Sequence, residues 1–183
     1  RQMQPQHATR ITTMAALAAC EAIEAVTQQQ PQIKWVNDIF LEGKKVCGIL
    51  TEGSFNLETG QLDDVVVGIG FNVYPPAGGF PPEIAEIADS ILQKQHSGTK
   101  NKLAAAFLNF FFQIYRGEND YASAYRARSM VIGKSIVVST PTASCNASAL
   151  DIDRDCRLIV RYEDGSIASL SSAEVSIRTE GMR

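Results

Sequence analysis

The sequence predicts an α/β protein with a mixed sheet and flanking helices, followed by a small β-barrel at the C-terminal end. Three observations support this fold class. Small and aliphatic residues recur at helical spacing early in the chain, β-branched runs follow them, and short alternating strands fill the part after Ile132. With 183 residues, of which 45% are hydrophobic, the chain can bury a core without disulfide bonds.

Three helices are expected. The stretch "ATRITTMAALAACEAIEAVTQQQP" predicts a helix over 11–26 that ends before Pro31, with a small-residue face suited to close packing on a sheet. Pro82 and the isoleucine spacing of "PEIAEIADSILQK" predict a second helix over 83–94. "NKLAAAFLNFFFQIYRG" predicts a third over 101–115, and its aromatic stripe is interpreted as core-facing rather than as a cofactor site.

The strand signals fall in two groups. "QIKWVNDIFLEGKKVCGILTEGSF" predicts two short strands around a turn at Gly43, and "DDVVVGIGFNV" predicts a β-branched strand interrupted by glycines. After Ile132 the chain reads as short strands with a hairpin turn at 163–165, which predicts the appended barrel.

Composition excludes several functional classes. The formal net charge of −3 gives no overall attraction to nucleic acid or to an anionic membrane. No apolar run approaches the roughly 20 residues that a membrane-spanning helix needs, and no signal peptide is visible. The cysteines form no C-x-x-C pair, which is typical of reduced packing thiols in a cytoplasmic protein; they are Cys20, Cys47, Cys145 and Cys156.

Charged residues beside the first two strands raise the question of what they face. Lys34 and Lys45 lie on either side of a hairpin-like turn, so both could reach one side of the sheet, and Asn37 and Asp38 follow Lys34. These residue types suit a nucleotide, because ammonium groups bind phosphate oxygens and Asp binds Mg²⁺ or ribose hydroxyls. Each residue also has a structural interpretation, since Lys-Trp can be a solvated charge beside an anchored aromatic and Asn-Asp an ordinary turn.

Glycines in the β-branched strand "GIGFN" invite a functional reason, because they weaken strand packing. Gly68 and Gly70 would let a ligand approach the backbone closely, and Asn72 ends the strand. The pattern is not the G-x-G-x-x-G of a dinucleotide fold. No P-loop, Ser-His-Asp set or metal-ligand spacing is present, and His7 and His96 read as ordinary loop residues.

The order of "KWVND", "GKKVCGILTE" and "VVVGIGFNV", followed by a Pro-rich loop, a helical pair and a terminal barrel, resembles the biotin–protein ligase family. The resemblance runs from the first helix to the C-terminus. Val36 replaces the family's usual Pro, and Cys47 replaces a usual Ala. The resemblance implies that residues 1–130 are the C-terminal portion of the catalytic domain and that residues 131–183 form an SH3-like barrel.

The resemblance implies a two-step reaction. The biotin carboxylate would join the α-phosphate of ATP, with Mg²⁺ as cofactor, and biotin would then pass to a lysine of a biotin carboxyl-carrier domain. Lys45 would contact the biotin carboxylate or the adenylate linkage, and Lys34 would face the phosphates. The resemblance assigns ATP binding to Asn37, Asp38 and Asn72, with Asp38 also as the Mg²⁺ ligand. It assigns the lining of the biotin slot to Gly48, Gly68 and Gly70. Arg178 is interpreted as a solvated strand-end charge, with a nucleotide-side contact as the open alternative.

Two family features upstream of the first helix are expected to lie outside this sequence: a strand, and a Gly/Arg-rich segment that closes over biotin and the adenylate. The chain is therefore expected to be an incomplete part of a ligase, with negligible transfer activity alone and an exposed apolar sheet edge. Self-association, with a homodimer as one arrangement, or a separate N-terminal piece would shield that edge. Two alternatives remain open, a lipoate–protein ligase and a non-catalytic remnant that binds a partner.

Overall fold

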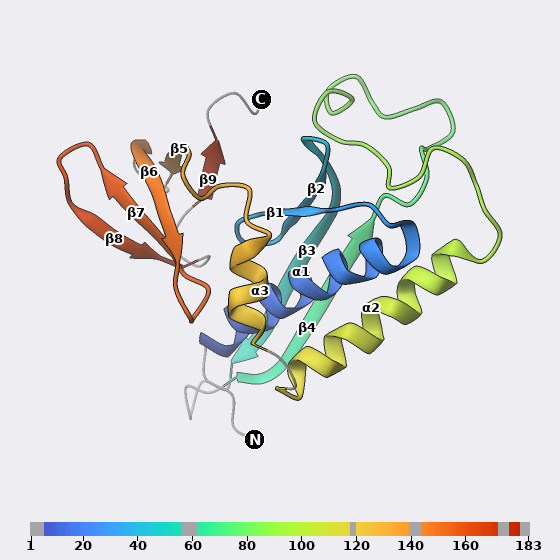
Figure 1. Cartoon of the computed structure of the whole chain (residues 1–183), viewed down its shortest axis with the longest axis horizontal. Coiled ribbons are helices and arrows are strands. Elements are labelled where there is room, and N and C mark those ends of the chain that lie inside the picture. Colours follow the sequence, from blue (N-terminus) through green and yellow to red (C-terminus); the bar gives the residue numbers. More distant parts are fainter. Residues whose placement is uncertain (1–5, 56–61, 118–119, 140–143, 172–175, 180–183) are drawn as a thin grey trace.

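A computed structural model describes residues 6–55, 62–117, 120–139, 144–171 and 176–179. These residues form two antiparallel sheets and three helices, and the helices lie beside the first sheet (Figure 1). The helices are α1 (Gln6–Thr27), α2 (Thr99–Tyr115) and α3 (Tyr121–Ala127). This arrangement confirms the α/β class. Within the described residues, no helix is long and apolar enough to cross a membrane.

The first sheet has the order β1-β2-β3-β4, with bounds Gln32–Lys34, Asp38–Leu41, Lys44–Phe55 and Leu62–Phe71. All three ladders are antiparallel, where a mixed sheet was predicted. Short connections explain the difference, because a few residues can reverse the chain but cannot carry it back to a parallel start. Parallel pairing is limited, in the described part, to isolated bridges Ile33↔Ser129 and Lys45↔Ala88.

The turn between β2 and β3 is a two-residue loop. Glu42 and Gly43 both have positive φ, 50° and 80°, as a hairpin loop matched to strand twist requires. The predicted bend at Gly43 is confirmed. The turn between β1 and β2 covers 35–37 and contains a cis peptide bond between Trp35 and Val36.

One face of the first sheet carries the core. Helix α1 lies across the strands and packs against α2 (Figure 1). Its buried alanines, among them Ala15 and Ala19, let its backbone approach the sheet closely. The opposite face is open: the side chains of Leu50 on β3 and Val66 on β4 are 61% and 64% exposed. Among the described strands β4 ends the sheet, and the exposed apolar edge that the sequence predicts stays a prediction.

The helix predicted over 83–94 is wrong. The segment forms turns and then pairs with the sheet: the Lys45 amide donates to Ile87 O (2.8 Å), the Asp89 amide to Lys45 O (3.0 Å) and the Ile91 amide to Asn72 O (2.7 Å). Helical spacing of isoleucines was a weak signal here, because backbone groups that bond to a sheet edge are unavailable to a helix. The helices predicted over 11–26 and 101–115 are confirmed as α1 and α2.

Helix α3 is an element that the sequence analysis did not predict. Asp120 caps its start by accepting a hydrogen bond from the Ser123 amide (3.4 Å), so a capping signal was present. Tyr121 and Tyr125 are its buried residues, and Arg128 just after it forms an ion pair with Glu24 of α1 (2.7 Å).

The second sheet lies beyond α3 and has the order β8-β7-β6-β5-β9. The bounds of β5 to β9 are Ser135–Ser139, Ser144–Ile152, Leu158–Tyr162, Ile167–Leu170 and Ser176–Thr179. The hairpin turn predicted at 163–165 is confirmed, since Gly165 has φ 83° and the Tyr162 amide donates to Ser166 O (2.9 Å). Among the described strands, β8 and β9 end the sheet, so the predicted closed barrel is not found there.

Candidate functional site

Four of the predicted site residues form one row across the first sheet. Lys34 of β1 lies opposite Asp38 of β2, Asp38 lies opposite Gly48 of β3, and Gly48 lies opposite Gly70 of β4. Side chains alternate between the faces of a strand, so Gly48 shares its face with the exposed Leu50, two residues on. The row therefore lies on the open face of the sheet, away from α1.

Lys45 joins this row because of a β-bulge. Residues three apart face opposite sides of a regular strand, so Lys45 and Gly48 should point apart. The register shifts between Ile39 and Phe40, which pair with Cys47 and Lys45 respectively, and Val46 is the extra residue. The Lys45 side chain consequently lies over Gly48: a Cβ at position 48 would be 3.2 Å from Lys45 Cε and 3.3 Å from its Nζ.

An ion pair fixes the end of the Lys45 side chain. Its Nζ lies 2.6 Å from Asp38 Oδ1, with the two side chains 42% and 25% exposed. Lys34 approaches from the neighbouring strand, with its Nζ 5.9 Å from the centroid of the Phe40 ring. Two ammonium groups and one carboxylate thus lie at one end of a floor made of glycine backbone. Phe40 is a supporting residue that the sequence analysis missed, although its alternation with Asp38 on β2 was a usable signal.

Gly68 belongs to the next row, where it lies opposite Leu50. A Cβ added to Gly68 would meet only Leu50 O, at 3.6 Å, and one added to Gly70 only Gly48 O, at 4.0 Å, so little stands above either glycine among the described atoms. These glycines leave a flat strip of backbone on the open face, where a planar ligand could lie against the sheet.

Asn37 and Asn72 use their side-chain amides to hold backbone segments. Asn37 Nδ2 donates to Ile49 O (2.6 Å), and the Ile49 amide donates to Asn37 O (3.1 Å). Asn72 Nδ2 donates to Asp89 O (3.2 Å) and so fixes the segment after the Pro-rich loop. The structure therefore places both residues at the rim of the row, where their amide N–H groups support the backbone.

The core below the row is neutral. Cys47 is buried under the sheet, and burial raises the pKa of its thiol well above the usual value. Burial likewise raises the pKa of Cys20 in α1 to about 12. Both thiols stay protonated at physiological pH, as packing residues do, so neither is available as a nucleophile.

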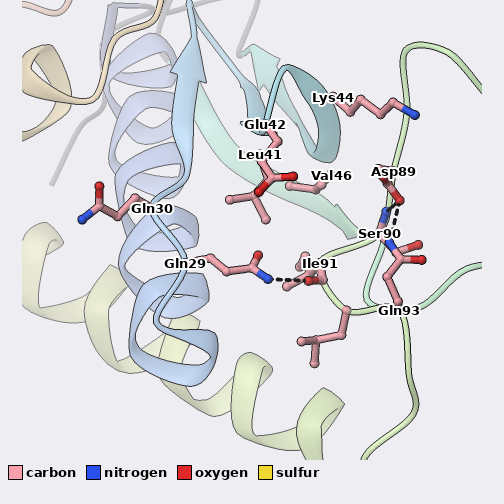
Figure 2. A pocket seen from close by; sticks show the side chains of 11 residues that line it. Gln29, Gln30, Leu41, Glu42, Lys44, Val46, Asp89, Ser90, Ile91 and Gln93 are labelled. Atoms are coloured by element: carbon pink, nitrogen blue, oxygen red, sulfur yellow. Dashed lines mark hydrogen bonds between the residues drawn. The ribbon is translucent and has the colours of Figure 1, made fainter.

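A separate pocket of about 520 Å³ lies at the β2–β3 hairpin (Figure 2). Its lining includes Gln29, Leu41, Lys44, Asp89 and Ile91, and none of the predicted site residues. Lys44 lies on the opposite face from Lys45 and donates to Ala85 O (3.3 Å). The two adjacent lysines thus differ in position, and only Lys45 belongs to the row.

The sequence of the chain matches those of known protein families. The model of the biotin/lipoate A/B protein ligase family matches residues 1–72, and that of the biotin protein ligase C-terminal domain matches residues 131–178. The chain is 31% identical to the bifunctional ligase/repressor BirA of Bacillus spizizenii over 180 residues, covering 94% of this chain and 54% of that protein. It spans about half the length of such relatives.

The fold agrees with that of a solved structure. The biotin protein ligase from Aquifex aeolicus in its apo form has a TM-score of 0.75 at 20% identity, covering 98% of this chain and 80% of that one. Sequence similarity is higher to the biotin–[acetyl-CoA-carboxylase] ligase of Paracoccus denitrificans, at 31% identity over 86% of this chain and 69% of that protein. A match of this identity and coverage, together with the shared fold, shows that the chain belongs to the biotin–protein ligase family.

Proposed function

We propose that the protein containing this chain is an ATP-dependent biotin–protein ligase, which forms biotinyl-AMP and then transfers biotin to a lysine of a biotin carboxyl-carrier domain. The observation that carries the proposal is the row on the open sheet face, where a glycine floor meets Lys45, Asp38 and Lys34. The names of the relatives support it, and so does a biotin protein ligase of the same fold solved with biotin and ATP.

The proposed division of the chain follows the two family matches. Residues 1–130 are the C-terminal portion of the catalytic domain, and residues 131–183 are an SH3-like unit that helps to dock the acceptor. Arg178 lies on β9, but its side chain is outside the described residues. A cytoplasmic location and a homodimer paired through sheet edges complete the proposal.

Biotin would occupy the glycine floor. Gly48, Gly68 and Gly70 offer backbone without intervening side chains, and Leu50 supplies exposed apolar surface beside them. The carboxylate of biotin would then reach Lys45, which lies over Gly48. A slot of this kind suits a neutral, flat ring system with a charged tail at one end.

ATP would lie toward Lys34 and Asp38. In the first step a carboxylate oxygen of biotin attacks the α-phosphorus and pyrophosphate leaves; in the second the acceptor amine attacks the acyl carbon and AMP leaves. Negative charge builds on phosphate or carboxylate oxygens in both steps, so ammonium groups already in place lower the barrier. In our proposal Lys45 holds the carboxylate and Lys34 the phosphates, while Asn37 and Asn72 position the rim.

Magnesium fits this site with one protein ligand. Mg²⁺ is commonly held by one or two carboxylates together with substrate phosphates and water, and Asp38 supplies one carboxylate beside the proposed phosphate position. Within the described residues, no group of three or more His, Cys, Asp or Glu side chains could hold a metal by itself. Asp38 would therefore bind the ion only together with ATP, whose charge the ion neutralises.

The test is biotin-dependent exchange of pyrophosphate into ATP by the full-length protein, with lipoate as the competing substrate. We expect exchange with biotin and none with lipoate. Exchange with lipoate instead would favour a lipoate–protein ligase. A protein that folds and binds a carboxyl-carrier domain but supports no exchange would favour the non-catalytic alternative.

Lys34→Ala and Asp38→Ala are expected to weaken ATP binding more than biotin binding. Each removes a group proposed to interact with phosphate or Mg²⁺, and a hydrogen bond to a charged group contributes about 1.5–3 kcal/mol, or roughly tenfold to a hundredfold in Kd. Isothermal titration of the full-length variants with each ligand measures both effects. Lys102→Ala, which removes an exposed charge on α2, is the control. A larger loss for biotin than for ATP would reverse the two assignments.

A further inference from the structure

The turn between β1 and β2 is held by residues outside the first sheet. The indole Nε1 of Trp35 donates to Cys156 O at the β6–β7 hairpin (2.9 Å), and the hydroxyl of Tyr125 in α3 donates to Val36 O (2.9 Å). Both bonds are buried. Burial raises the pKa of Tyr125 well above its usual value, so its hydroxyl keeps the proton that it donates.

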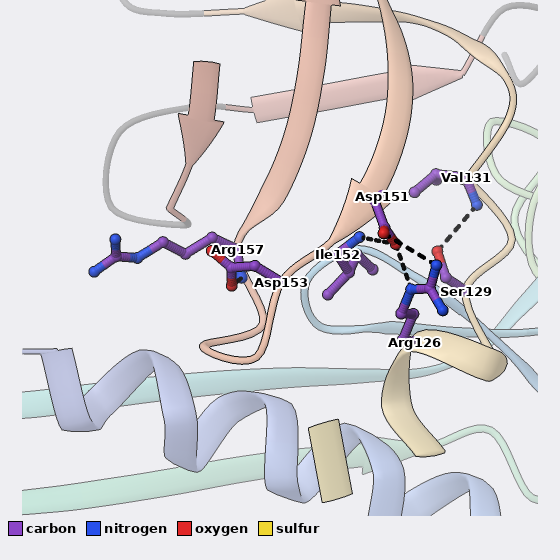
Figure 3. Close-up of polar contacts among 7 residues, drawn as sticks. All are labelled: Arg126, Ser129, Val131, Asp151, Ile152, Asp153 and Arg157. Carbon is purple, nitrogen blue, oxygen red and sulfur yellow. Dashed lines mark hydrogen bonds and ion pairs between the residues drawn. The ribbon is translucent and has the colours of Figure 1, made fainter. Parts of the chain in front are cut away.

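The group that accepts the Trp35 hydrogen bond is itself fixed. Asp153 Oδ1 accepts the backbone N–H groups of Asp155 and Arg157, both at 2.9 Å, and the Cys156 amide donates to Asp153 O (2.9 Å). Figure 3 shows Asp153 and Arg157 at this hairpin, close to α1. Cys156 has φ 61° and its side chain is fully buried. The carbonyl of Cys156 therefore has little freedom to follow the indole if the turn shifts.

Helix α3, which carries Tyr125, contacts the second sheet, to which the Cys156 hairpin also belongs. Arg126 forms a bidentate ion pair with Asp151 of β6 (Figure 3). Its Nε donates to Asp151 Oδ1, and its Nη2 donates to Oδ2 at 3.0 Å. Beyond α3 the chain pairs with the outer edge of β1: the Ile33 amide donates to Arg128 O (2.8 Å), and the Met130 amide donates to Ile33 O (2.9 Å). Helix α3, the segment after it and the second sheet thus form one support for β1 and its turn.

This support bears on the row because the turn joins two of its members. Lys34 is the last residue of β1, Asp38 is the first of β2, and the two are cross-strand partners. A displacement of the turn would move both side chains relative to the glycine floor. The floor should move less, because the β3–β4 ladder also holds Gly48, Gly68 and Gly70, although Asn37 of the turn bonds to Ile49 beside Gly48.

We propose that Trp35 and Tyr125 are positioning residues. Through their hydrogen bonds, α3 and the second sheet determine the positions of Lys34 and Asp38. The inference rests on the proposed function, in which Lys34 and Asp38 serve ATP. The second sheet then determines the geometry of the nucleotide side of the site directly, and it reaches the biotin side less directly, through the ion pair of Asp38 with Lys45. Losing either hydrogen bond weakens ATP use selectively.

Trp35→Phe and Tyr125→Phe in the full-length protein test this inference, because each removes one donor and keeps an aromatic ring in place. We expect KM for ATP to rise about three- to tenfold in each variant, the range for one lost hydrogen bond. KM for biotin should change less than KM for ATP in each variant, because the glycine floor keeps its β3–β4 pairing. Biotin-dependent pyrophosphate exchange measures both constants, and thermal melting confirms that each variant folds.

Tyr121→Phe is the matched control. Tyr121 is also buried on α3, and its hydroxyl accepts a hydrogen bond from Arg10 Nε of α1 (3.3 Å) and interacts with the Cys156 side chain, so Tyr121→Phe disturbs the surroundings of Cys156 without removing a hydrogen bond to the turn. We expect a comparable fall in melting temperature without a change in KM for ATP. Suppose that the wild-type protein is active but the Trp35 and Tyr125 variants behave like Tyr121→Phe, or show equal rises in KM for biotin and for ATP. Either result would overturn the positioning role alone. Wild-type protein without biotin-dependent exchange would overturn the proposed function and this inference with it.

Discussion

Lys45→Ala in the full-length protein is expected to lower the rate of biotinyl-AMP formation about tenfold to over a hundredfold. The variant removes the ammonium group that lies over Gly48, where the biotin carboxylate is proposed to meet the α-phosphate. A charge-assisted contact contributes about 1.5–3 kcal/mol, and each 1.4 kcal/mol or so corresponds to a tenfold change in rate. Biotin-dependent pyrophosphate exchange, followed at saturating ATP and biotin, measures the effect.

Lys44→Ala is the matched control for this experiment. Lys44 is the adjacent residue and carries the same charge, but it points to the other face of β3 and donates to Ala85 O. Its loss should leave the exchange rate nearly unchanged. Neither variant should lower the stability of the fold by more than about 1 kcal/mol, since the Lys45–Asp38 pair is partly exposed to solvent. Unchanged exchange in Lys45→Ala, or equal losses in both lysine variants, would reject the role of Lys45.

The row itself could be predicted from the sequence only in part. Two charged clusters beside strands around a short turn indicated that Lys34 and Lys45 could share one side of a sheet, and the β2–β3 hairpin confirms the turn. The bulge at Val46 was not visible in the pattern. It depends on how Ile39 and Phe40 pair across the hairpin, which is a matter of register rather than of the composition of either strand.

Local signals were misleading where backbone groups found distant partners. Residues 83–94 have helical spacing, yet the amides of Asp89 and Ile91 donate to carbonyls of Lys45 and Asn72. The side-chain amides of Asn37 and Asn72 also bond to carbonyls brought near by folding. Such partners are fixed by the packing of the sheet and leave no periodic trace in the sequence.

The support of the β1–β2 turn was equally invisible, because its two bonds join residues that are 121 and 89 positions apart. In the sequence, Trp35 reads as an aromatic anchor beside a charged strand end. The structure shows what anchors it: a carbonyl in the second sheet, with Tyr125 of an unpredicted helix bonded to the next residue of the turn. Long-range contacts of this kind decide where Lys34 lies, although the residue itself could be selected from its motif.

Gly48→Ala is expected to reduce exchange about tenfold or more while the protein keeps its stability. A Cβ at position 48 would lie 3.2 Å from Lys45 Cε and 3.3 Å from Lys45 Nζ, closer than ordinary contact. The end of a lysine side chain is flexible, so it would move aside at little cost to folding. Its ammonium would then leave its place beside Asp38, and displacement of a catalytic group by about 1 Å can lower a rate by a factor on the order of 100.

Gly70→Ala separates this effect from simple obstruction of the floor. Gly70 lies directly opposite Gly48, but a Cβ there would meet only Gly48 O, at 4.0 Å, and would not touch Lys45. We expect Gly70→Ala to raise KM for biotin with little change in kcat, and Gly48→Ala to lower kcat. If Gly48 acts through Lys45, the double variant Gly48→Ala/Lys45→Ala should be no slower than Lys45→Ala alone, because residues that act through one contact are not additive. Additive losses in the double variant would show that Gly48 contributes by a route that does not involve Lys45.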